Sequence, residues 1–463
     1  MRMNLFESLR FKFEQADWSK NPVLGLLDTI LELHPELIKI LAPDIVKGSK
    51  QSIFGRKDMP SIEQIIRAAL YKEEKGLDYR ELEYHQSDSR ICEQFLKLDL
   101  SLPYSFQTYQ KYISRIRKDS LDKFMVALNN IAMKEGLEDI TKLRQDSTVI
   151  KTNIHYPTNN SLVWDCIRES HRLLTQLQKE IEGVNFRNYT KNAKKTYFLI
   201  NNTKTRKSKN QKGNAEKSRD LDKRTKLFRN QLITFTKSIN QVSNVIKKKN
   251  IYSISPQSEL IILSLERLLP LMHQVYAMTW KKEIKGEQVH KEEKLYSIYE
   301  LHTDIIVKGG REIQFGHKVN LATGKSNLIL GCNILKGNPS DSSLYQGMIE
   351  EVITNYGIVP RDSATDGGYA SIANMEYSQE KGIINIVFNK ISGSLKNITS
   401  SKNMSTRLKK WRSGIEAVIS NLKRGYGIFR CNWKGEAHFN QKVLWSVIAY
   451  NIRVMTGAVL QRI

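Results

Sequence analysis

Three carboxylates stand in sequence settings that suit chemistry on phosphodiester bonds. Asp146 lies in a short β-type run, Asp366 lies where small residues meet a Gly-Gly turn, and Glu416 lies in an amphipathic helical pattern. Carboxylates on two strands and one helix can hold a pair of Mg²⁺ ions about 4 Å apart. Mg²⁺ takes hard oxygen ligands and keeps several of its waters, so three side chains are enough. These residues therefore predict a metal-dependent site, with Mg²⁺ as the cofactor and Mn²⁺ as a substitute.

Two cations accompany Glu416 on one predicted helix, 408–426. At about 100° per residue, Arg412 lies about 40° and Lys423 about 20° from Glu416 around the helix axis. The three side chains therefore project in similar directions. A common surface row of ion pairs would give the same pattern, but Arg424 continues the basic row, which favours contacts with phosphates.

The composition indicates a globular protein with a polyanionic partner. The 463 residues allow two or three domains, and 40% of them are hydrophobic. Lys and Arg number 73 against 48 Asp and Glu, which gives a net charge of +25. So large an excess favours nucleic acid or an anionic membrane surface as partner. Because no apolar run approaches the about 18 residues of a membrane helix, we expect nucleic acid and no membrane.

The cysteines and the N-terminus indicate a cytoplasmic protein. Residues 1–8 lack the apolar core of a signal peptide. Cys92, Cys166, Cys332 and Cys431 lie far apart and form no Cys-x-x-Cys pair. They therefore predict free thiols in a reducing compartment, not zinc ligands or a disulfide framework.

The first part of the chain is expected to be helical. Residues 1–57 form a helical segment, and residues 58–135 form a compact module in which Pro60-Ser61 opens a helix that Gly76 ends. A last helix starts at Ser105, and its cations fall mostly away from its apolar face. That arrangement suits a helix-turn-helix reader of double-stranded DNA, although an ordinary solvated helix would show it too. The candidate DNA contacts are Lys111, Arg115 and Lys118.

Residues 165–295 are expected to form a basic, mainly helical insertion. Between 191 and 250 the sequence has 18 Lys and Arg against three acids, more than half of the whole excess. The stretch 201–220 is poor in apolar residues, which favours a loop or hairpin tip. This charge can clamp nucleic acid, or it can simply keep a linker soluble. The candidate contacts here are Lys204, Arg206, Lys207 and Lys209.

From residue 296 the pattern changes to short strands and helices. The segments 305–308 and 312–321 look like one interrupted strand, and 327–335 pairs with it as a hairpin. Taken after the strand around Asp146, the order is three strands, then helix, strand, helix, strand and helix. This is the order of an RNase H-like α/β domain. We therefore expect that fold class for a catalytic domain in two pieces, 136–164 and 296–463.

These residues also resemble the DDE transposases of bacterial insertion sequences. The similar signature is Arg-x3-Glu-x6-Lys, here Arg412, Glu416 and Lys423, and Gln145-Asp-Ser-Thr and Thr365-Asp-Gly-Gly-Tyr are similar as well. Many relatives have a tyrosine three residues before that arginine, where this chain has Lys409. The resemblance covers roughly 58–165 and 295–455.

The resemblance implies a catalytic triad of Asp146, Asp366 and Glu416 on the first strand, the fourth strand and a later helix. It implies metal-dependent cleavage at transposon ends and strand transfer into target DNA, by a homodimer in the bacterial cytoplasm at the nucleoid. Arg412 and Lys423 would then hold phosphates. Two alternatives remain open: an RNase H-like nuclease that cuts without joining, and a catalytically silent DNA-binding protein derived from a transposase. The intact triad disfavours the second.

Overall fold

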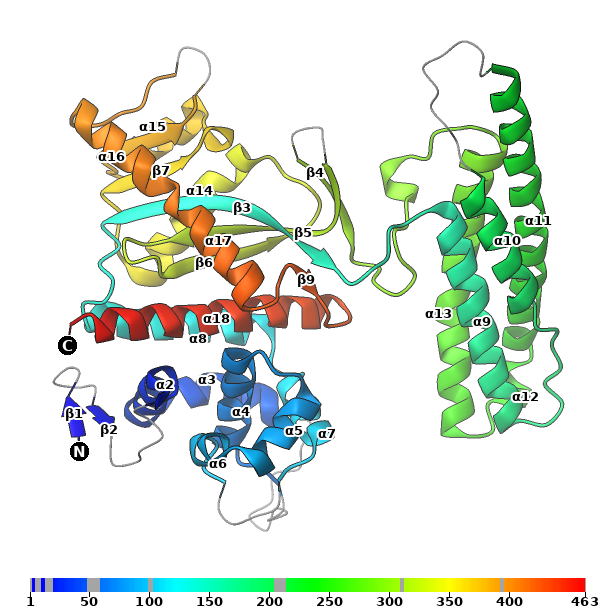
Figure 1. Ribbon diagram of the computed structural model, residues 1–463, viewed down its shortest axis with the longest axis horizontal. Helices are drawn as coiled ribbons and strands as arrows, with labels where there is room; N and C mark the ends of the chain where they lie inside the picture. The colour runs from blue at the N-terminus through cyan, green and yellow to red at the C-terminus, as the bar shows by residue number, and fades with distance from the viewer. Residues whose placement is uncertain are drawn as a thin grey trace. The chain divides into compact units, whose positions relative to one another are not determined.

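A computed structural model describes residues 2–4, 10–12, 20–47, 59–98, 103–203, 214–308, 312–391 and 395–462 (Figure 1). The chain divides into two compact units. The first unit combines Met1–Asn153 with Asp304–Ile463, and the second unit is Ile154–Thr303. The second unit is therefore an insertion in the first, and it includes all of the predicted insertion 165–295.

Seven strands in the described part of the first unit form one mixed sheet. Their bounds are β3 Lys142–Thr152, β4 Asp304–Lys308, β5 Glu312–Thr323, β6 Ile329–Leu335, β7 Asp362–Asp366, β8 Asn385–Asn389 and β9 Arg430–Cys431. β5 pairs antiparallel with β3 on one side and with β4 and β6 on the other. β7 pairs parallel with β3, and β8 pairs parallel with β7. The central order is thus β6, β5, β3, β7, β8, and β9 pairs with the end of β3.

The structure corrects one predicted strand. The segments 305–308 and 312–321 are not one interrupted strand, because β4 and β5 pair antiparallel with Lys308 opposite Glu312. Gly309-Gly310 stands between the two strands in the sequence. A Gly-Gly pair between two extended runs is a hairpin signal, and it outweighs the continuity of the apolar pattern.

Helices contact both faces of the sheet. The bounds of the helices after β6 are α14 Asp341–Tyr356, α15 Ile372–Glu380, α16 Lys402–Arg412, α17 Gly414–Gly425 and α18 Glu436–Leu460. Successive residues of a strand point to opposite faces. Gln145 of β3 accordingly donates its amide to the Tyr345 carbonyl of α14 at 3.4 Å. Thr148 and Ile150 instead line a small cavity with residues of α17 and α18, so Asp146, two residues before Thr148, belongs to the α17 face.

The predicted helix 408–426 is in fact two helices. α16 ends at Arg412, Ser413 separates them, and α17 begins at Gly414. Glycine weakens a helix interior by about 1 kcal/mol relative to alanine, which makes Ser413-Gly414 a natural place for the break. Arg412 and Glu416 therefore belong to different helices, although they still lie four residues apart.

Helix α18 is the central helix of the first unit. It is the one helix in the described part of the chain that is long and apolar enough to cross a membrane on length and composition, with a mean hydropathy of 1.5. However, 72% of that stretch is buried inside the protein. Figure 1 shows it beside α8 (Lys118–Lys134), with which it is in contact. Its apolar character is thus explained by its place in the core.

The N-terminal part is mainly helical, but it begins with a hairpin. β1 (Arg2–Asn4) pairs antiparallel with β2 (Arg10–Lys12), so the prediction of helix throughout 1–57 is wrong there. Each strand alternates polar, apolar and polar residues, which is the period of a strand. The helices that follow are α2 Pro22–Leu33, α3 Glu36–Val46, α4 Ile62–Lys75, α5 Tyr79–Asp88, α6 Arg90–Phe95, α7 Phe106–Ile113 and α8.

The capping residues of α4 agree with the prediction. The Ser61 hydroxyl accepts a hydrogen bond from the Gln64 backbone N–H, and the Gln64 side chain accepts one from the Ser61 N–H. Gly76 ends the helix in the left-handed region, with φ +68°. The helix that follows Ser105 ends at Ile113, so Arg115 lies beyond it and Lys118 begins α8, although both were expected among its cations. These helices share one hydrophobic core with the sheet.

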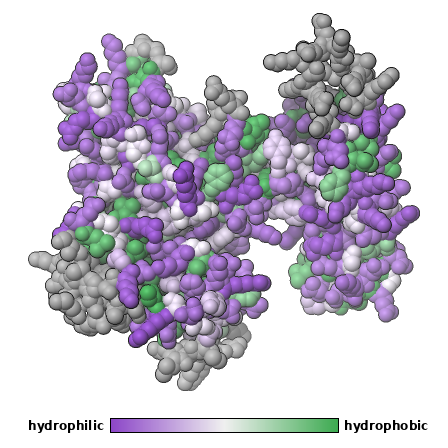
Figure 2. Space-filling model, viewed as in Figure 1, coloured by the Kyte–Doolittle hydropathy of each residue, from purple (hydrophilic) through white to green (hydrophobic). Residues whose placement is uncertain are grey.

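The second unit is helical throughout its regular elements and has a core of its own. Its elements are α9 Asn159–Glu180, α10 Thr190–Asn202, α11 Asn214–Lys247, α12 Lys249–Tyr252, α13 Pro256–Thr279, a π-helical turn η2 Trp280–Ile284 and a 3-10 turn η3 Lys291–Glu293. α9, α10, α11 and α13 pack against one another. The visible face of this unit is mostly hydrophilic, with scattered hydrophobic spots (Figure 2).

Candidate active site

Strand pairing places Asp146 and Asp366 side by side. β3 and β7 run parallel, and their pairing ends with Gln145 opposite Thr365. Asp146 and Asp366 are the next residues of these two strands. Asp366 is the last residue of β7, and the carboxyl ends of parallel strands are where open α/β sheets form their binding sites.

One guanidinium contacts all three predicted carboxylates. Arg412 Nη2 donates to Asp146 Oδ2 at 2.9 Å and lies 3.9 Å from Asp366 Oδ2. Arg412 Nη1 donates to Glu416 Oε1 at 2.9 Å. Asp146 and Asp366 contact the same nitrogen, so their oxygens can be no farther apart than the sum of those two distances, and Glu416 contacts the neighbouring nitrogen of the same guanidinium. The triad is therefore assembled within the about 10 Å that two metal ions about 4 Å apart can bridge.

The carboxylates face solvent, whereas the cation lies beneath them. The exposed fraction of the side chain is 19% for Asp146, 46% for Asp366 and 65% for Glu416, but only 7% for Arg412. Arg412 Nε is buried without a hydrogen-bond partner among the described residues. A ligand from solvent can therefore reach the acids before it reaches the arginine.

Arg144 supports this arrangement, and sequence reasoning missed it. It donates from Nε to Thr323 Oγ1 at 2.8 Å, from Nη1 to the Trp411 carbonyl and from Nη2 to Asn327. Since Trp411 precedes Arg412, this bond anchors the end of α16. Burial, together with the nearby Arg412 charge, lowers the pKa of Arg144 to about 10. The available signal was an arginine two residues before Asp146 in a predicted strand, because buried arginines are rare unless they are paired.

Gly414 completes the support. An added Cβ there would lie 2.5 Å from Arg144 Nη1. A larger residue at this position would therefore force the Arg144 guanidinium to shift from its place at the end of α16. The break between α16 and α17 is thus part of how Arg412 is positioned.

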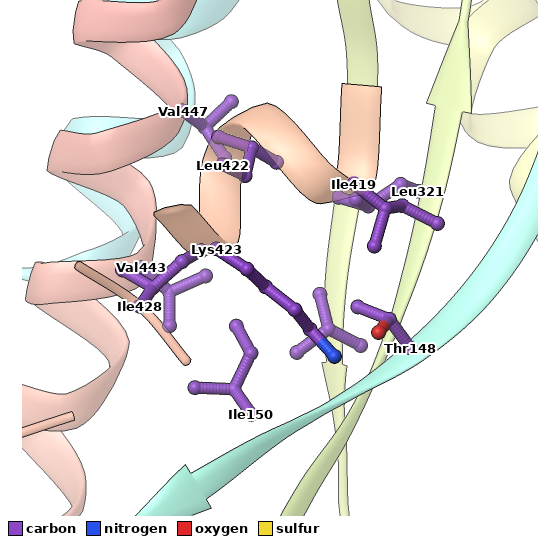
Figure 3. A pocket seen from close by; sticks show the side chains of 10 residues that line it. Thr148, Ile150, Leu321, Ile419, Leu422, Lys423, Ile428, Val443 and Val447 are labelled. Atoms are coloured by element: carbon purple, nitrogen blue, oxygen red, sulfur yellow. The ribbon is translucent and has the colours of Figure 1, made fainter. Parts of the chain in front are cut away.

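Lys423 lies on the same face of the sheet as Asp146. It is half-buried and lines a cavity of about 10 Å³, together with apolar residues of the sheet, α17 and α18. Figure 3 shows its ammonium group pointing toward Thr148, two residues after Asp146. Its Nζ also lies 5.9 Å from the centre of the Phe429 ring. Arg424, the next residue, is exposed.

The predicted DNA contacts of the N-terminal module have mixed surroundings. Lys111 is exposed. Arg115 instead donates to the Ile45 and Lys47 carbonyls at 3.1 and 3.2 Å. Lys118 pairs with Asp122 at 2.7 Å. Arg115 therefore links the segment after α7 to the end of α3, and Lys118 forms an ion pair within α8, which a count of helical angles could not reveal.

The candidate contacts of the basic insertion are only partly visible. Lys204, Arg206, Lys207 and Lys209 lie outside the described residues. Other cations of 191–250 are exposed in the second unit: Lys191, Lys194, Lys195, Lys223, Lys226, Arg229, Lys237, Lys247, Lys248 and Lys249. Most of the basic charge predicted for this unit that the structure describes is therefore on its surface.

The three carboxylates of the triad can bind divalent cations when the Arg412 guanidinium moves away from them. No group of three or more His, Cys, Asp or Glu side chains in the described part of the chain is arranged to hold a metal ion by itself. The triad carboxylates surround a guanidinium instead, so three negative charges share one positive charge. Carboxylate oxygens are the ligands that Mg²⁺ and Mn²⁺ prefer. The remaining negative charge favours the binding of a divalent ion.

Comparison with known proteins places this site in a family. Residues 300–452 match the family model described as Transposase DDE domain. The match contains Asp366, Arg412, Glu416 and Lys423, while Asp146 precedes it. Searches of curated proteins and of solved structures found no match. Residues 300–452 therefore correspond to a transposase DDE domain, and this match supports a DDE transposase.

Proposed function

We propose that this chain is the transposase of a bacterial insertion sequence, which binds the ends of its element and catalyses metal-dependent DNA cleavage and strand transfer. The observation that carries this proposal is the convergence of Asp146, Asp366 and Glu416 around Arg412. The family match supports it. So does the strand order β6, β5, β3, β7, β8, with β7 and β8 parallel to β3, which agrees with an RNase H-like catalytic domain.

The residues of the site have distinct roles in this proposal. Asp146, Asp366 and Glu416 hold the divalent ions, Mg²⁺ or Mn²⁺, through hard oxygens. Bound there, the ions supply activation of a water or a 3′-OH and stabilisation of the leaving oxygen. Arg412 and Lys423 hold the scissile or flanking phosphates by charge-assisted hydrogen bonds. Arg144 keeps the end of α16, and hence Arg412, in place.

The basic surface supports DNA as the substrate. The net charge of +25 and the exposed cations of the second unit can neutralise phosphates without reading sequence. An insertion sequence has two ends, so we propose a homodimer on double-stranded DNA as the active complex. We place it at the nucleoid in the bacterial cytoplasm, without a membrane partner.

The test is an end-cleavage and strand-transfer assay on DNA from both flanks of the reading frame. Asp146→Asn, Asp366→Asn and Glu416→Gln should each abolish cleavage with Mg²⁺ or Mn²⁺ while DNA binding persists. Glu380→Gln, an exposed carboxylate on α15, is the matched control and should cleave normally. A triad variant with near wild-type cleavage would remove that residue from the site.

The same assay separates the alternatives. A nuclease would cut the ends but fail to join pre-cleaved ends to a target duplex. A silent DNA-binding derivative would bind the ends and neither cut nor join them.

A further inference from the structure

The ion pairs of the triad point to a competition within the site. Arg412 contacts the three carboxylates that the proposed function assigns to metal binding, at 2.9, 2.9 and 3.9 Å. We infer that Arg412 is the counter-ion of the triad in the metal-free protein, and that divalent metal ions compete with its guanidinium for the same oxygens. This inference rests on the proposed function, and it concerns how that site is regulated.

The competition between metal ions and Arg412 for carboxylate oxygens is strongest at Asp146. Its Oδ1 accepts a hydrogen bond from the Ser147 backbone N–H at 2.8 Å, and its Oδ2 accepts one from Arg412 at 2.9 Å. Both oxygens of Asp146 are therefore engaged before any metal enters. Glu416 is different, because Arg412 takes only its Oε1 and its side chain is 65% exposed. Metal ligation thus has to disturb the Arg412–Asp146 bond more than the Arg412–Glu416 bond.

The Arg412 guanidinium has few other hydrogen bonds that fix its position. Among the described residues, the hydrogen bonds that its guanidinium donates go to Asp146 and Glu416, and its Nε has no partner. It is the last residue of α16, next to the break at Ser413-Gly414. Once the carboxylates turn to a metal ion, the guanidinium needs another anion. A DNA phosphate supplies one with matching two-pronged geometry.

Metal and DNA binding should therefore be coupled through this one side chain. Metal entry releases Arg412 for the phosphate, and phosphate binding draws Arg412 away from the carboxylates. By linkage, each ligand strengthens the other by the same factor. The site in which Arg412 contacts the carboxylates therefore reaches its full metal affinity only when DNA is bound.

The deciding measurement is Mn²⁺ binding by the full chain without DNA. Arg412→Gln should bind Mn²⁺ about tenfold more tightly than the wild type, a change of about 1.4 kcal/mol. Arg412→Lys should fall between them, because a single ammonium cannot contact three carboxylates as a guanidinium does. Lys409→Gln removes an exposed cation from the same helix and should stay close to the wild type. Equal or weaker Mn²⁺ binding by Arg412→Gln would overturn the competition.

A second measurement uses the wild-type protein, in case Arg412→Gln fails to fold. Phenylglyoxal modifies accessible arginines, and mass spectrometry can follow Arg412 and Arg144 in the same sample. Mg²⁺ should increase the modification rate of Arg412 several-fold and leave that of the anchored Arg144 unchanged. An Arg412 rate that Mg²⁺ leaves unchanged or lowers would contradict the release of the guanidinium.

Asp146→Asn separates this inference from the function on which it rests. If Asp146→Asn loses Mn²⁺ binding while Arg412→Gln binds like the wild type, the metal site stands and only the competition is wrong. If Asp146→Asn binds Mn²⁺ as the wild type does, Asp146 is not a ligand, and the proposed function fails together with the inference.

Discussion

Two clusters, one in each unit of this protein, bury polar side chains in opposite ways. In the core of the second unit, one set of buried polar groups is neutral and its members pair with one another: His171 Nε2 lies 3.0 Å from Ser238 Oγ, and Gln231 donates to Asn160 Oδ1 at 2.6 Å. In the triad cluster of the first unit, the buried group is the cation Arg412, and its partners are three carboxylates that solvent can reach. The first cluster is uncharged, and the second carries surplus negative charge.

The difference separates architecture from function. A buried network of hydrogen bonds between neutral groups fixes how helices pack, and it needs no bound ligand once each group has a partner. A cluster of like charges around one cation costs stability, and such clusters occur where ligands or metal ions are bound. The comparison predicts that variants in the two places will fail in different ways.

The largest expected effect is on catalysis by the triad. Asp146→Asn should lower the rate of end cleavage by at least about 10³-fold, because one metal ligand is lost. Gln231→Leu should instead leave the cleavage rate per folded molecule unchanged and destabilise the second unit by about 1–3 kcal/mol, because Asn160 loses a partner. Cleavage rates and hydrogen exchange on the same samples check both. A Gln231→Leu protein that is stable but inactive would contradict the assignment of a structural role to the neutral network.

The positions of the triad could be predicted from sequence, but the contacts of Arg412 could not. The strand around Asp146, the Gly-Gly turn after Asp366 and the helical stripe around Glu416 are local patterns, and local patterns are what a sequence displays. The position of Arg412 at the end of α16 depends on the bond from Arg144 to the Trp411 carbonyl, and Arg144 is more than 250 positions earlier in the chain. Long-range contacts of this kind leave only a weak signal in the sequence, here an arginine two residues before Asp146 in the same strand.

The same limit applies to the N-terminal module. The caps of α4 at Ser61 and Gly76 were predictable because the capping residues lie within the helix ends. The bonds from Arg115 to the carbonyls of Ile45 and Lys47 cross about 70 positions, so the angular pattern that suggested a DNA contact could not show them. An exposed cation and a structural one look alike in sequence.

Arg144 offers a way to sharpen the comparison within the first unit. Arg144→Met removes a buried cation whose side-chain hydrogen bonds go to neutral groups, so the fold should survive with a modest change in melting temperature. Freeing the end of α16 should nevertheless misplace Arg412 and slow cleavage by about 10²-fold, the cost of an error of about 1 Å in a catalytic group. Kinetics and thermal melting of the variant provide the check. Lys142→Met, on the same strand, is the control. Cleavage at the wild-type rate by Arg144→Met would show that Arg412 needs no such anchor.

The basic charge of the second unit should act on affinity rather than on chemistry. Each phosphate contact contributes about −0.9 to the slope of log K against log[salt]. Replacing Lys204, Arg206, Lys207 and Lys209 with Ala should flatten that slope by roughly two to four units, for transposon-end and unrelated DNA alike. A parallel Ala variant of Lys191, Lys194 and Lys195, exposed on α10, tests whether contacts extend along the unit. If neither variant changes the slope, the charge serves solubility and not DNA binding.

The smallest expected effect is a pH dependence that only the neutral network should show. Burial lowers the pKa of His171 to about 4, while the unfolded chain binds that proton near pH 6.5. Between these values the unfolded state holds more protons than the folded state, so stability increases with pH and is fully present only above about 6.5. On going from pH 7 to pH 5, opening of α9 and α11 should become more favourable by about twentyfold, seen as faster hydrogen exchange. His171→Gln, which cannot titrate, should lose most of this dependence, whereas His273→Gln on the surface should keep it. An equal pH dependence in all three proteins would mean that His171 is not the group that titrates, and that the second unit owes its acid sensitivity to charges elsewhere.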